Sequence, residues 1–562
     1  MPSAVSASEY LLWSILAFGP LAFGCVEPWS LAVLEIAIFS LCLTHLITAK
    51  DRFTTPAQKT LVPCSLALAA LGLWQYADPS PLGAPAPLGP FTTDRLLTMG
   101  EILLYLSFAG LLWATSGILS DKARLRRFMW AVFLVGVCVA VAGIIQKGQG
   151  NTLIYGLREV RPTRNPFGPF YNVNHAACLM GMSFLLGLGL FTERFVSFRG
   201  VFSVGAISEL ISKQLLLVFF MAVLAAGLLA TTSRGALMAL VAGMGLTGAL
   251  SAKFVRIPWL RWALRILGFA SVGVYLWVFA ARPAMLGLAE LQKDGSALYR
   301  LSMYRSSWRM FQDFPLFGTG LGTFQAAYPP YQEGYVQGHV LYAHSDFVEF
   351  LTEAGLVGCI IVLVGLVLFC RAACKNIHAL PAGERKGLSL GLSGAAAAFT
   401  LHCLFEFNFQ IPGAAVVFLC TLAALGSKVM SHTPTEDEED APRPRLRRPA
   451  LAAAVCATFI LCGLSLSPAI AQYYTWRAKG CRISAKPYFL ERAISWHPEP
   501  SCYRQLAATY LELADANPQA RLVLLRAGLE QAQKAVQARP YDPRSLQLRA
   551  ALVWRLGRAG DA

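Results

Sequence analysis

Charged side chains are scarce in this chain. Asp, Glu, Lys and Arg make up 14% of its 562 residues, whereas a soluble domain is nearer a quarter charged. Hydrophobic residues account for 56%, and the mean hydropathy is +0.51. This composition excludes an ordinary soluble protein and indicates a membrane protein.

Metal-binding patterns are also lacking. The fourteen cysteines have no His partners at zinc spacing, and most lie in apolar runs, where cysteine behaves as a small hydrophobic residue. Cys481 and Cys502 differ, because both fall in a polar C-terminal segment. We predict a disulfide between them, with buried free thiols as the alternative.

Positive charge is distributed unevenly along the chain, whose net charge is +16. Basic residues concentrate in short segments between alternate pairs of apolar runs. The positive-inside rule makes these segments cytoplasmic, so the charge reflects orientation rather than nucleic-acid binding. The basic segments are residues 50–59, 122–127, 194–213, 253–265, 371–386 and 428–448. The segments predicted to face outward are residues 146–174, the turn at residues 233–235, and residues 282–356.

The apolar runs predict an all-α, polytopic membrane protein with about 12–13 transmembrane helices. The first run is not followed by an Ala-x-Ala cleavage site, so we expect it to be retained. An odd number of spans with a cytoplasmic N-terminus places the C-terminus outside. The predicted spans are residues 11–23, 31–47, 61–75, 96–114, 128–145, 176–191, 215–230, 235–250, 266–281, 351–369, 387–405, 412–426 and 451–470.

The predicted domain organisation has a transmembrane domain, a linker, a last span and an outward helical domain. These cover residues 1–430 (with the large outward loop 282–356), 431–448, 449–470 and 471–562. The linker is an acidic run followed by a Pro/Arg run, which is typical of a flexible cytoplasmic tether.

The C-terminal domain contains a weak internal repeat. Residues 493–498 and 535–540 both read Ala, four residues, then Pro, as at the end of the second helix of a tetratricopeptide repeat. Their separation of about 42 residues exceeds the usual 34, so the repeat is irregular. The domain is interpreted either as a docking surface for a protein partner or as a small helical cap.

The first outward segment combines cations with a rigid backbone. Arg158, Arg161 and Arg164 lie on the side where positive charge is normally sparse, and Asn174 and His175 stand at the mouth of the next span. Arg suits forked contacts with phosphate, although for each one an ordinary lipid headgroup contact is the alternative.

The turn at residues 233–235 joins two apolar runs almost directly. Arg234 must therefore lie at or just below the outer interface, where a cation either snorkels or binds an anion. In the long outward loop, Arg300 begins a predicted helix that ends at a Gly-rich turn, residues 315–322. That turn follows a helix, so it is not a dinucleotide site. No acidic cluster in these outward segments resembles a metal cage, and we expect neither metal nor cofactor.

His344 directly precedes a predicted helix start. Asp346 and Glu349 have capping-box spacing, and Glu353 follows one turn later. The positive end of the helix dipole favours a neutral imidazole, which can accept a proton as a general base must. The alternative is an inert loop histidine beside a helix cap.

These features resemble the O-antigen ligase/polymerase family. The resemblance rests on Ser-Arg-Gly at residues 233–235, on Arg300 ahead of the Gly-rich turn, and on HSDFVEFLTEAGLVG at residues 344–358. The stretches PLAFGCVEPW at 20–29 and FEFNFQIP at 405–412 are also similar to the family. Ser345 stands where the family often has Asn, and Tyr304 where it often has Trp.

The resemblance implies glycan transfer from a polyprenyl (undecaprenyl) diphosphate carrier to an acceptor hydroxyl, at the periplasmic face of a bacterial inner membrane. Arg234 and Arg300 would stabilise the diphosphate, and His344 would act as the base. The outward Arg cluster, Asn174 and His175 would help to bind the donor, and the three acidic residues after His344 would support the site. Direct displacement would invert the anomeric carbon.

Four functions remain open from the sequence. They are a ligase acting on a lipid or other terminal acceptor, a polymerase of O-antigen or exopolysaccharide repeat units, a protein O-oligosaccharyltransferase, and a transporter of an anionic lipid. Intramembrane Arg residues suit the transporter, but no inverted repeat supports it.

Overall fold

The computed structural model describes residues 6–48, 55–79, 89–150, 152–160, 165–197, 212, 214–252, 258–281, 295–334, 338–380, 384–430 and 448–560. Across these residues the fold is all-helical, with three isolated β-bridges and no strand. The predicted all-α class is therefore confirmed. Arg161 and Arg164 lie outside the described residues, as do residues 282–294 of the large outward loop and residues 431–447 of the linker.

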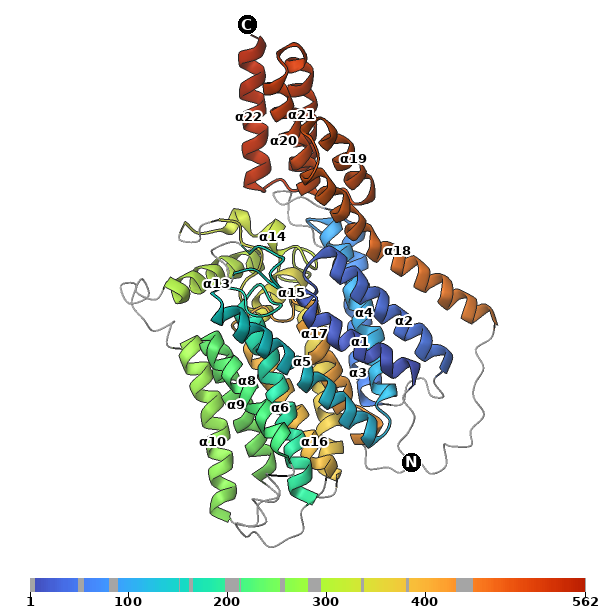
Figure 1. Cartoon of the computed structure of the whole chain (residues 1–562), viewed down its shortest axis with the longest axis vertical. Coiled ribbons are helices and arrows are strands. Elements are labelled where there is room, and N and C mark those ends of the chain that lie inside the picture. Colours follow the sequence, from blue (N-terminus) through green and yellow to red (C-terminus); the bar gives the residue numbers. More distant parts are fainter. Residues whose placement is uncertain are drawn as a thin grey trace.

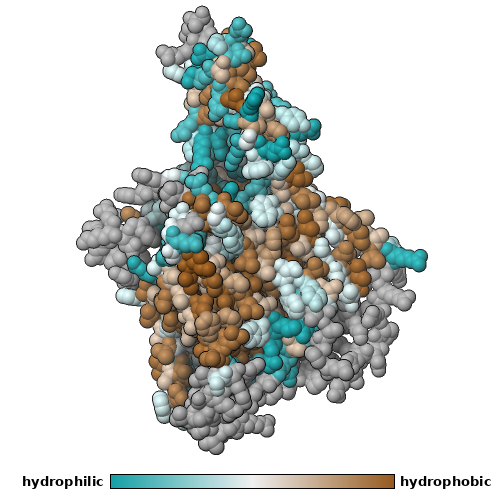
Figure 2. All heavy atoms as spheres, viewed as in Figure 1, coloured by the Kyte–Doolittle hydropathy of each residue, from teal (hydrophilic) through white to brown (hydrophobic). Residues whose placement is uncertain are grey.

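Eight of the described helices are long and apolar enough to cross a membrane, which makes the chain a multi-pass membrane protein. They are α2 (Pro28–Thr48), α3 (Pro56–Ala77), α4 (Arg95–Ile118), α5 (Lys122–Gly148), α6 (Val173–Ser197), α10 (Pro258–Leu276), α15 (Asp346–Ala379) and α18 (Arg448–Lys479). Large apolar side chains are exposed along several of them, and Figure 2 shows a broad hydrophobic surface over this part of the molecule.

The other predicted spans also fall on helices, but these are shorter or less apolar. They are α1 (Ala7–Leu21), α8 (Leu215–Thr231), α9 (Arg234–Ser251), α16 (Glu384–Cys403) and α17 (Pro412–Leu425). The 17 residues of α8 rise only about 26 Å, less than the hydrocarbon thickness of roughly 30 Å. The structure thus supports about eight spans, and the larger number stays a prediction.

Small residues allow close packing at the centre of the bundle. A Cβ on Gly189 of α6 would lie 2.8 Å from the Cα of Gly391 of α16. A Cβ on Gly243 of α9 would lie 2.9 Å from the carbonyl of Gly394. Helices in lipid gain packing energy mainly through such close approach. These contacts hold α6, α9 and α16 together beneath the site described below.

Two helices that lie between α10 and α15 in the sequence, α13 (Gly295–Asp313) and the single-turn α14 (Phe324–Ala327), are at one end of the bundle (Figure 1). The Gly-rich turn after α13 packs on the start of α15, where Thr319 N donates to the carbonyl of Thr352 at 3.0 Å and Gly320 N to that of Glu353 at 3.1 Å. The tight turn predicted for residues 315–322 is therefore present.

The C-terminal helices stand at the same end of the bundle, beyond α18 (Figure 1). Helix α18 continues without a break to Lys479, so the predicted boundary at residue 471 lies inside a helix. Four further helices follow, α19 (Lys486–Trp496), α20 (Pro500–Ala516), α21 (Arg521–Ala538) and α22 (Pro543–Gly560). Helices α19 and α21 end just before Pro498 and Pro540, as the repeat pattern predicts. The tetratricopeptide assignment itself stays a prediction.

The expected disulfide is absent, because Cys481 and Cys502 are both free thiols. Cys502 is buried in a small apolar cluster with Ala471 and Ala493. The Sγ of Cys481 instead donates to the carbonyl of Ala478 at the end of α18, 3.3 Å away. The two thiols thus belong to different local environments.

Candidate functional site

A helix begins immediately after His344, as the sequence predicts. Its N-cap is Ser345, whose hydroxyl accepts a bond from Val348 N at 3.4 Å. The expected capping box between Asp346 and Glu349 is wrong, because both carboxylates fold back onto neighbouring loops. Asp346 accepts from Phe409 N at 2.9 Å, and Glu349 accepts from Ala343 N at 2.7 Å.

Glu353 has a similar structural contact. Its carboxylate is buried and accepts from Phe324 N, at the start of α14, at 2.8 Å. The three acidic residues after His344 therefore tie α15 to the loops around it. They support the segment that carries the histidine rather than facing an open site.

His344 has a constrained backbone. Its φ is +52°, in the left-handed region that few side chains adopt. The carbonyl of His344 accepts a bond from the hydroxyl of Tyr304 on α13 at 3.0 Å. The imidazole meets the ring of Phe407 edge-on at 4.9 Å between centroids, and the side chain keeps 29% exposure. Strain of this kind is concentrated at functional sites.

The imidazole faces a buried carboxylate that the sequence reasoning did not assign to the site. His344 Nδ1 lies 3.5 Å from Oε1 of Glu406, in the loop between α16 and α17. The same oxygen accepts from Nη2 of Arg300 at 3.1 Å and from Nδ2 of Asn174 at 2.8 Å. Glu406 is 2% exposed. One carboxylate thus joins three predicted site residues.

The electrostatics of this cluster keep Glu406 ionised. Burial by itself would raise the pKa of the carboxyl, but the neighbouring His344, His175 and Arg300 lower it to about 2. The site therefore contains a fixed negative charge beside the imidazole and a guanidinium. Arg300 retains donors beyond the one used on Glu406, because a guanidinium carries five N–H groups.

A second row of polar groups continues from this cluster into the bundle. His175 Nδ1 lies 3.0 Å from Oδ1 of Asn408, and Nδ2 of Asn408 lies 3.2 Å from Nδ1 of His402. His402 packs beside Gly235, since a Cβ there would lie 3.3 Å from Nε2 of the ring. This row connects the predicted residue His175 to the start of α9.

Arg234 lies at that start. It is the first residue of α9, follows the N-cap Ser233, and is exposed. Arg234 has no ion pair among the residues that the structure describes. An exposed guanidinium near a polar row is open to an anionic ligand.

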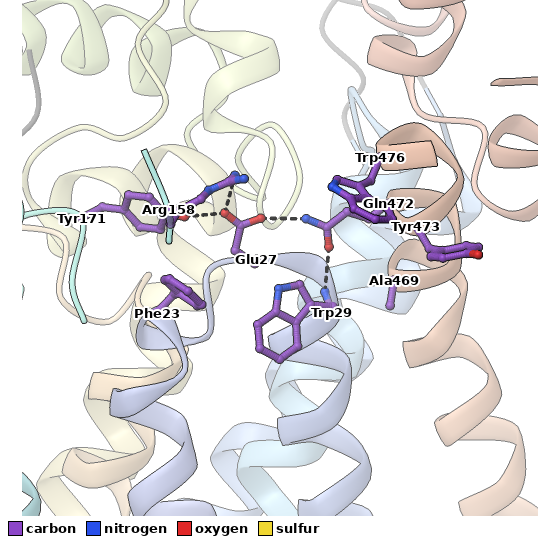
Figure 3. Close-up of a pocket in the computed structure, with 9 residues that line it drawn as sticks. All are labelled: Phe23, Glu27, Trp29, Arg158, Tyr171, Ala469, Gln472, Tyr473 and Trp476. Atoms are coloured by element: carbon purple, nitrogen blue, oxygen red, sulfur yellow. Dashed lines mark hydrogen bonds and ion pairs between the residues drawn. The ribbon is translucent and has the colours of Figure 1, made fainter. Parts of the chain in front are cut away.

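Arg158 is placed elsewhere. Its Nη2 donates to Glu27 at 2.8 Å, in a pocket between the start of α2 and α18 (Figure 3). The structure therefore brings together Asn174, His175, Arg300 and His344, but not Arg158. Within the described ranges no group of three or more Cys, His, Asp or Glu side chains could hold a metal ion. The expectation of a metal-free reaction stays a prediction.

Glu406, Asn408 and His402 are the residues that the sequence reasoning missed. The first two interrupt the aromatic run FEFNF at residues 405–409. Two polar residues inside such a run, at the end of a predicted span, are a signal of a buried polar role. Apart from the contact between Asn408 and His402, their partners are remote in the chain, so the sequence could not identify what they bind.

Together, the fold and the polar cluster define a multi-pass helical membrane protein with a site at one end of its bundle. Residues 219–363 match the family model described as O-Antigen ligase. The matched segment contains Arg234, Arg300 and His344 and indicates a glycan-transferring enzyme acting on a lipid-linked glycan. Asn174, Glu406 and the C-terminal helices lie outside it. A search of curated proteins finds no match.

Proposed function

We propose that this protein transfers a glycan from a polyprenyl diphosphate carrier to an acceptor hydroxyl at the periplasmic face of a bacterial inner membrane. The observation that carries the proposal is the convergence of Arg300, His344 and Asn174 on the single buried carboxylate of Glu406. It supplies a base, a cation and a fixed countercharge within one site.

His344 is the proposed general base. Its Nδ1 faces Glu406, which leaves Nε2 to accept the proton of the acceptor hydroxyl. The carboxylate stabilises the imidazolium that forms, as a buried acid does in a Ser-His-Asp triad. A positioned base of this kind contributes roughly 10²- to 10⁴-fold.

Arg300 and Arg234 are the proposed groups for the diphosphate. As the acceptor oxygen attacks the anomeric carbon, the bond to the carrier oxygen breaks and its electron pair leaves with the diphosphate. Guanidinium groups stabilise that charge at the interface. A single displacement inverts the anomeric carbon. None of these steps requires a metal or cofactor.

The glycan profile of a deletion strain tests this function. Loss of a ligase leaves full-length polymer on the carrier, whereas loss of a repeat-unit polymerase leaves single carrier-linked units. Loss of glycan from a protein would indicate the oligosaccharyltransferase. An unchanged profile of glycans, with altered distribution of an anionic lipid, would contradict glycan transfer and favour the transporter.

A further inference from the structure

A second polar constellation lies outside the cluster around Glu406. It lines a cavity of about 300 Å³ between the start of α2, the loop before α6, and the C-terminal part of α18 (Figure 3). The lining residues are Phe23, Glu27, Trp29, Arg158, Tyr171, Ala469, Gln472, Tyr473 and Trp476. Pockets for small ligands start at about this size and combine apolar walls with a few placed polar groups.

The polar groups of this pocket are held in fixed positions. Oε1 of Glu27 accepts from Arg158 Nη2 at 2.8 Å and from the hydroxyl of Tyr171 at 2.5 Å. Oε2 accepts from Nε2 of Gln472 at 2.7 Å, and the amide oxygen of Gln472 accepts from Trp29 N at 3.0 Å. A carboxylate, an amide and a guanidinium are thus preorganised along one wall.

Aromatic rings surround this polar wall. Figure 3 shows Phe23 and Tyr171 on one side of Glu27 and Trp476 above Gln472 on the other, with Trp29 below. Trp29 is 41% and Trp476 66% exposed. Trp29 also packs edge-to-face with Phe18 and Phe23, at 6.3 and 6.2 Å between ring centroids. Tyr473 projects away from Glu27.

The charge of the pocket selects among ligands. Arg158 and Glu27 form an ion pair at 2.8 Å, so the charged lining residues sum to zero. Unlike the site near Arg234, the pocket therefore holds no cation in excess for a phosphate headgroup. Planar polar side chains form paired hydrogen bonds with neighbouring hydroxyls, and aromatic faces accept the C–H faces of a ring. A sugar ring has both features, neighbouring hydroxyls for the polar side chains and C–H faces for the aromatic rings.

We propose that this pocket is a saccharide subsite that holds one sugar residue of a glycan chain. Trp29 and Trp476 stack on the sugar, and Glu27, Gln472 and Arg158 bind its hydroxyls. Tyr171 and Asn174 belong to one short segment, and Asn174 binds Glu406, so the subsite is linked to the cluster around His344. The identity of the ligand as a glycan rests on the proposed function. The pocket includes α18, which lies outside the matched segment 219–363.

Saccharide binding to the full-length protein in nanodiscs tests the proposal. The probe is the host's oligosaccharide, released from its carrier by mild acid and titrated by saturation-transfer NMR. Trp29→Ala and Trp476→Ala should each weaken binding by about five- to tenfold. Trp476→Phe should restore part of the affinity. Trp554→Ala, which removes a tryptophan on α22 that is 58% exposed, should leave binding unchanged.

Two results would contradict the saccharide subsite, and a third variant separates it from the proposed catalytic role of His344. Unchanged affinity in the Trp29/Trp476 double variant would overturn the subsite, as would displacement of the sugar by glycerophosphoethanolamine, which would identify a lipid headgroup site. His344→Ala serves as the separating variant, because it should bind the saccharide normally without transferring it. If that variant still transfers glycan, the assignment of His344 as the base fails. The proposed function fails if the parent protein transfers no glycan, whereas the subsite is judged by saccharide binding alone.

Discussion

Glu406 is a buried carboxylate that side chains from three remote segments contact. Asn174, Arg300 and His344 all approach its Oε1. Glu406→Gln keeps the shape but removes the charge, so the imidazolium loses its countercharge during transfer. We expect kcat to fall by about 10- to 100-fold, which is part of the roughly 10²- to 10⁴-fold that a positioned base contributes, with a smaller change in KM. Glu406→Asp should restore part of the rate.

Glycan transfer by purified variants, measured as initial rates, checks this expectation. Glu491→Gln on the exposed C-terminal helix α19 is a matched control and should behave as the parent protein. A Glu406→Gln variant with parental kcat and normal membrane insertion would show that the carboxylate only fills space.

The same carboxylate predicts a pH-dependent stability. The pKa of Glu406 is lowered from 4.5 to about 2 because, despite burial, its neighbours His344, His175 and Arg300 favour the ionised form. A lowered folded-state pKa stabilises the fold above the unfolded pKa and loses this effect as pH falls toward the folded pKa. The difference in Tm between the parent and Glu406→Gln should therefore be largest above about pH 5 and shrink between pH 5 and 2. Tm can be measured in detergent by differential scanning fluorimetry. A difference in Tm that stays constant between about pH 5 and 2 would contradict this prediction.

The proposed roles of His344 and the two arginines predict different kinetic signatures. His344→Ala should abolish transfer with donor binding nearly intact, because a base acts only as the hydroxyl attacks. Arg234→Ala and Arg300→Ala should lose activity and also weaken donor binding, since the diphosphate is charged before and during transfer. Replacing either arginine by Lys should restore only part of the activity and of the donor affinity, because an ammonium lacks the forked contact.

Donor affinity measured with a non-reacting carrier diphosphate separates these cases. A purified His344→Ala protein that transfers glycan at the parental rate would leave His344 as a loop residue ahead of a helix cap. Equal donor binding by the parent and both Ala variants at the arginines would remove the guanidinium groups from the diphosphate site.

At the scale of elements, the start of α15 depends on two glycines. Gly355 has φ +61° and ψ −164°, which only glycine adopts readily, and a Cβ there would lie 2.4 Å from the carbonyl oxygen of Leu316. A Cβ on Gly318 would lie 2.3 Å from the backbone of Glu353. The Gly-rich turn and α15 therefore meet backbone to backbone, which fixes the helix that His344 precedes.

Gly355→Ala should destabilise the fold by at least about 1–3 kcal/mol, from backbone strain alone, and lower activity by displacing His344. Thermal unfolding and transfer rates, measured on the same preparation, check both effects. Gly557→Ala on α22 is the control, since a Cβ there meets no atom within 4 Å. A variant at Gly355 as stable as this control would contradict the tight contact.

The helices could be predicted from the sequence, whereas the contacts between them could not. Hydrophobic runs predict the helices because burial and lipid contact act locally, and the polar start at residues 344–349 predicts where α15 begins. The cap at Ser345 and the contacts of Asp346 and Glu349 depend on loops brought in by the fold, so residue spacing misassigned them. Glu406 and Arg300 are 106 positions apart, and no local pattern encodes their pairing.

At the scale of the whole molecule, the C-terminal helices are joined to the end of the bundle that carries the site. Nε of Arg539, the residue directly after α21, donates to Oδ2 of Asp94 at 2.6 Å, and both side chains are largely buried. The other oxygen of Asp94 caps α4 through Leu96 N and Leu97 N. The contact between Arg539 and Asp94 joins the C-terminal helices directly to the end of the bundle that carries the site, so we expect both to face the same compartment.

Because the C-terminal helices and the site lie at the same end of the bundle, thiol labelling at several positions tests one membrane orientation of the protein. In a cysteine-depleted background, Gln312→Cys on α13 and Ser495→Cys on α19, both exposed, should react with an impermeant thiol reagent in cells with a permeable outer membrane. A Cys within residues 433–448 should react only after the inner membrane is opened, because the positive-inside rule keeps that basic segment in the cytoplasm. If Gln312→Cys is labelled and Ser495→Cys is not, the C-terminal helices do not lie on the same side of the membrane as α13. Fully reversed labelling would place the cluster around Glu406 in the cytoplasm, away from a periplasmic donor and acceptor, and would refute the proposed periplasmic transfer.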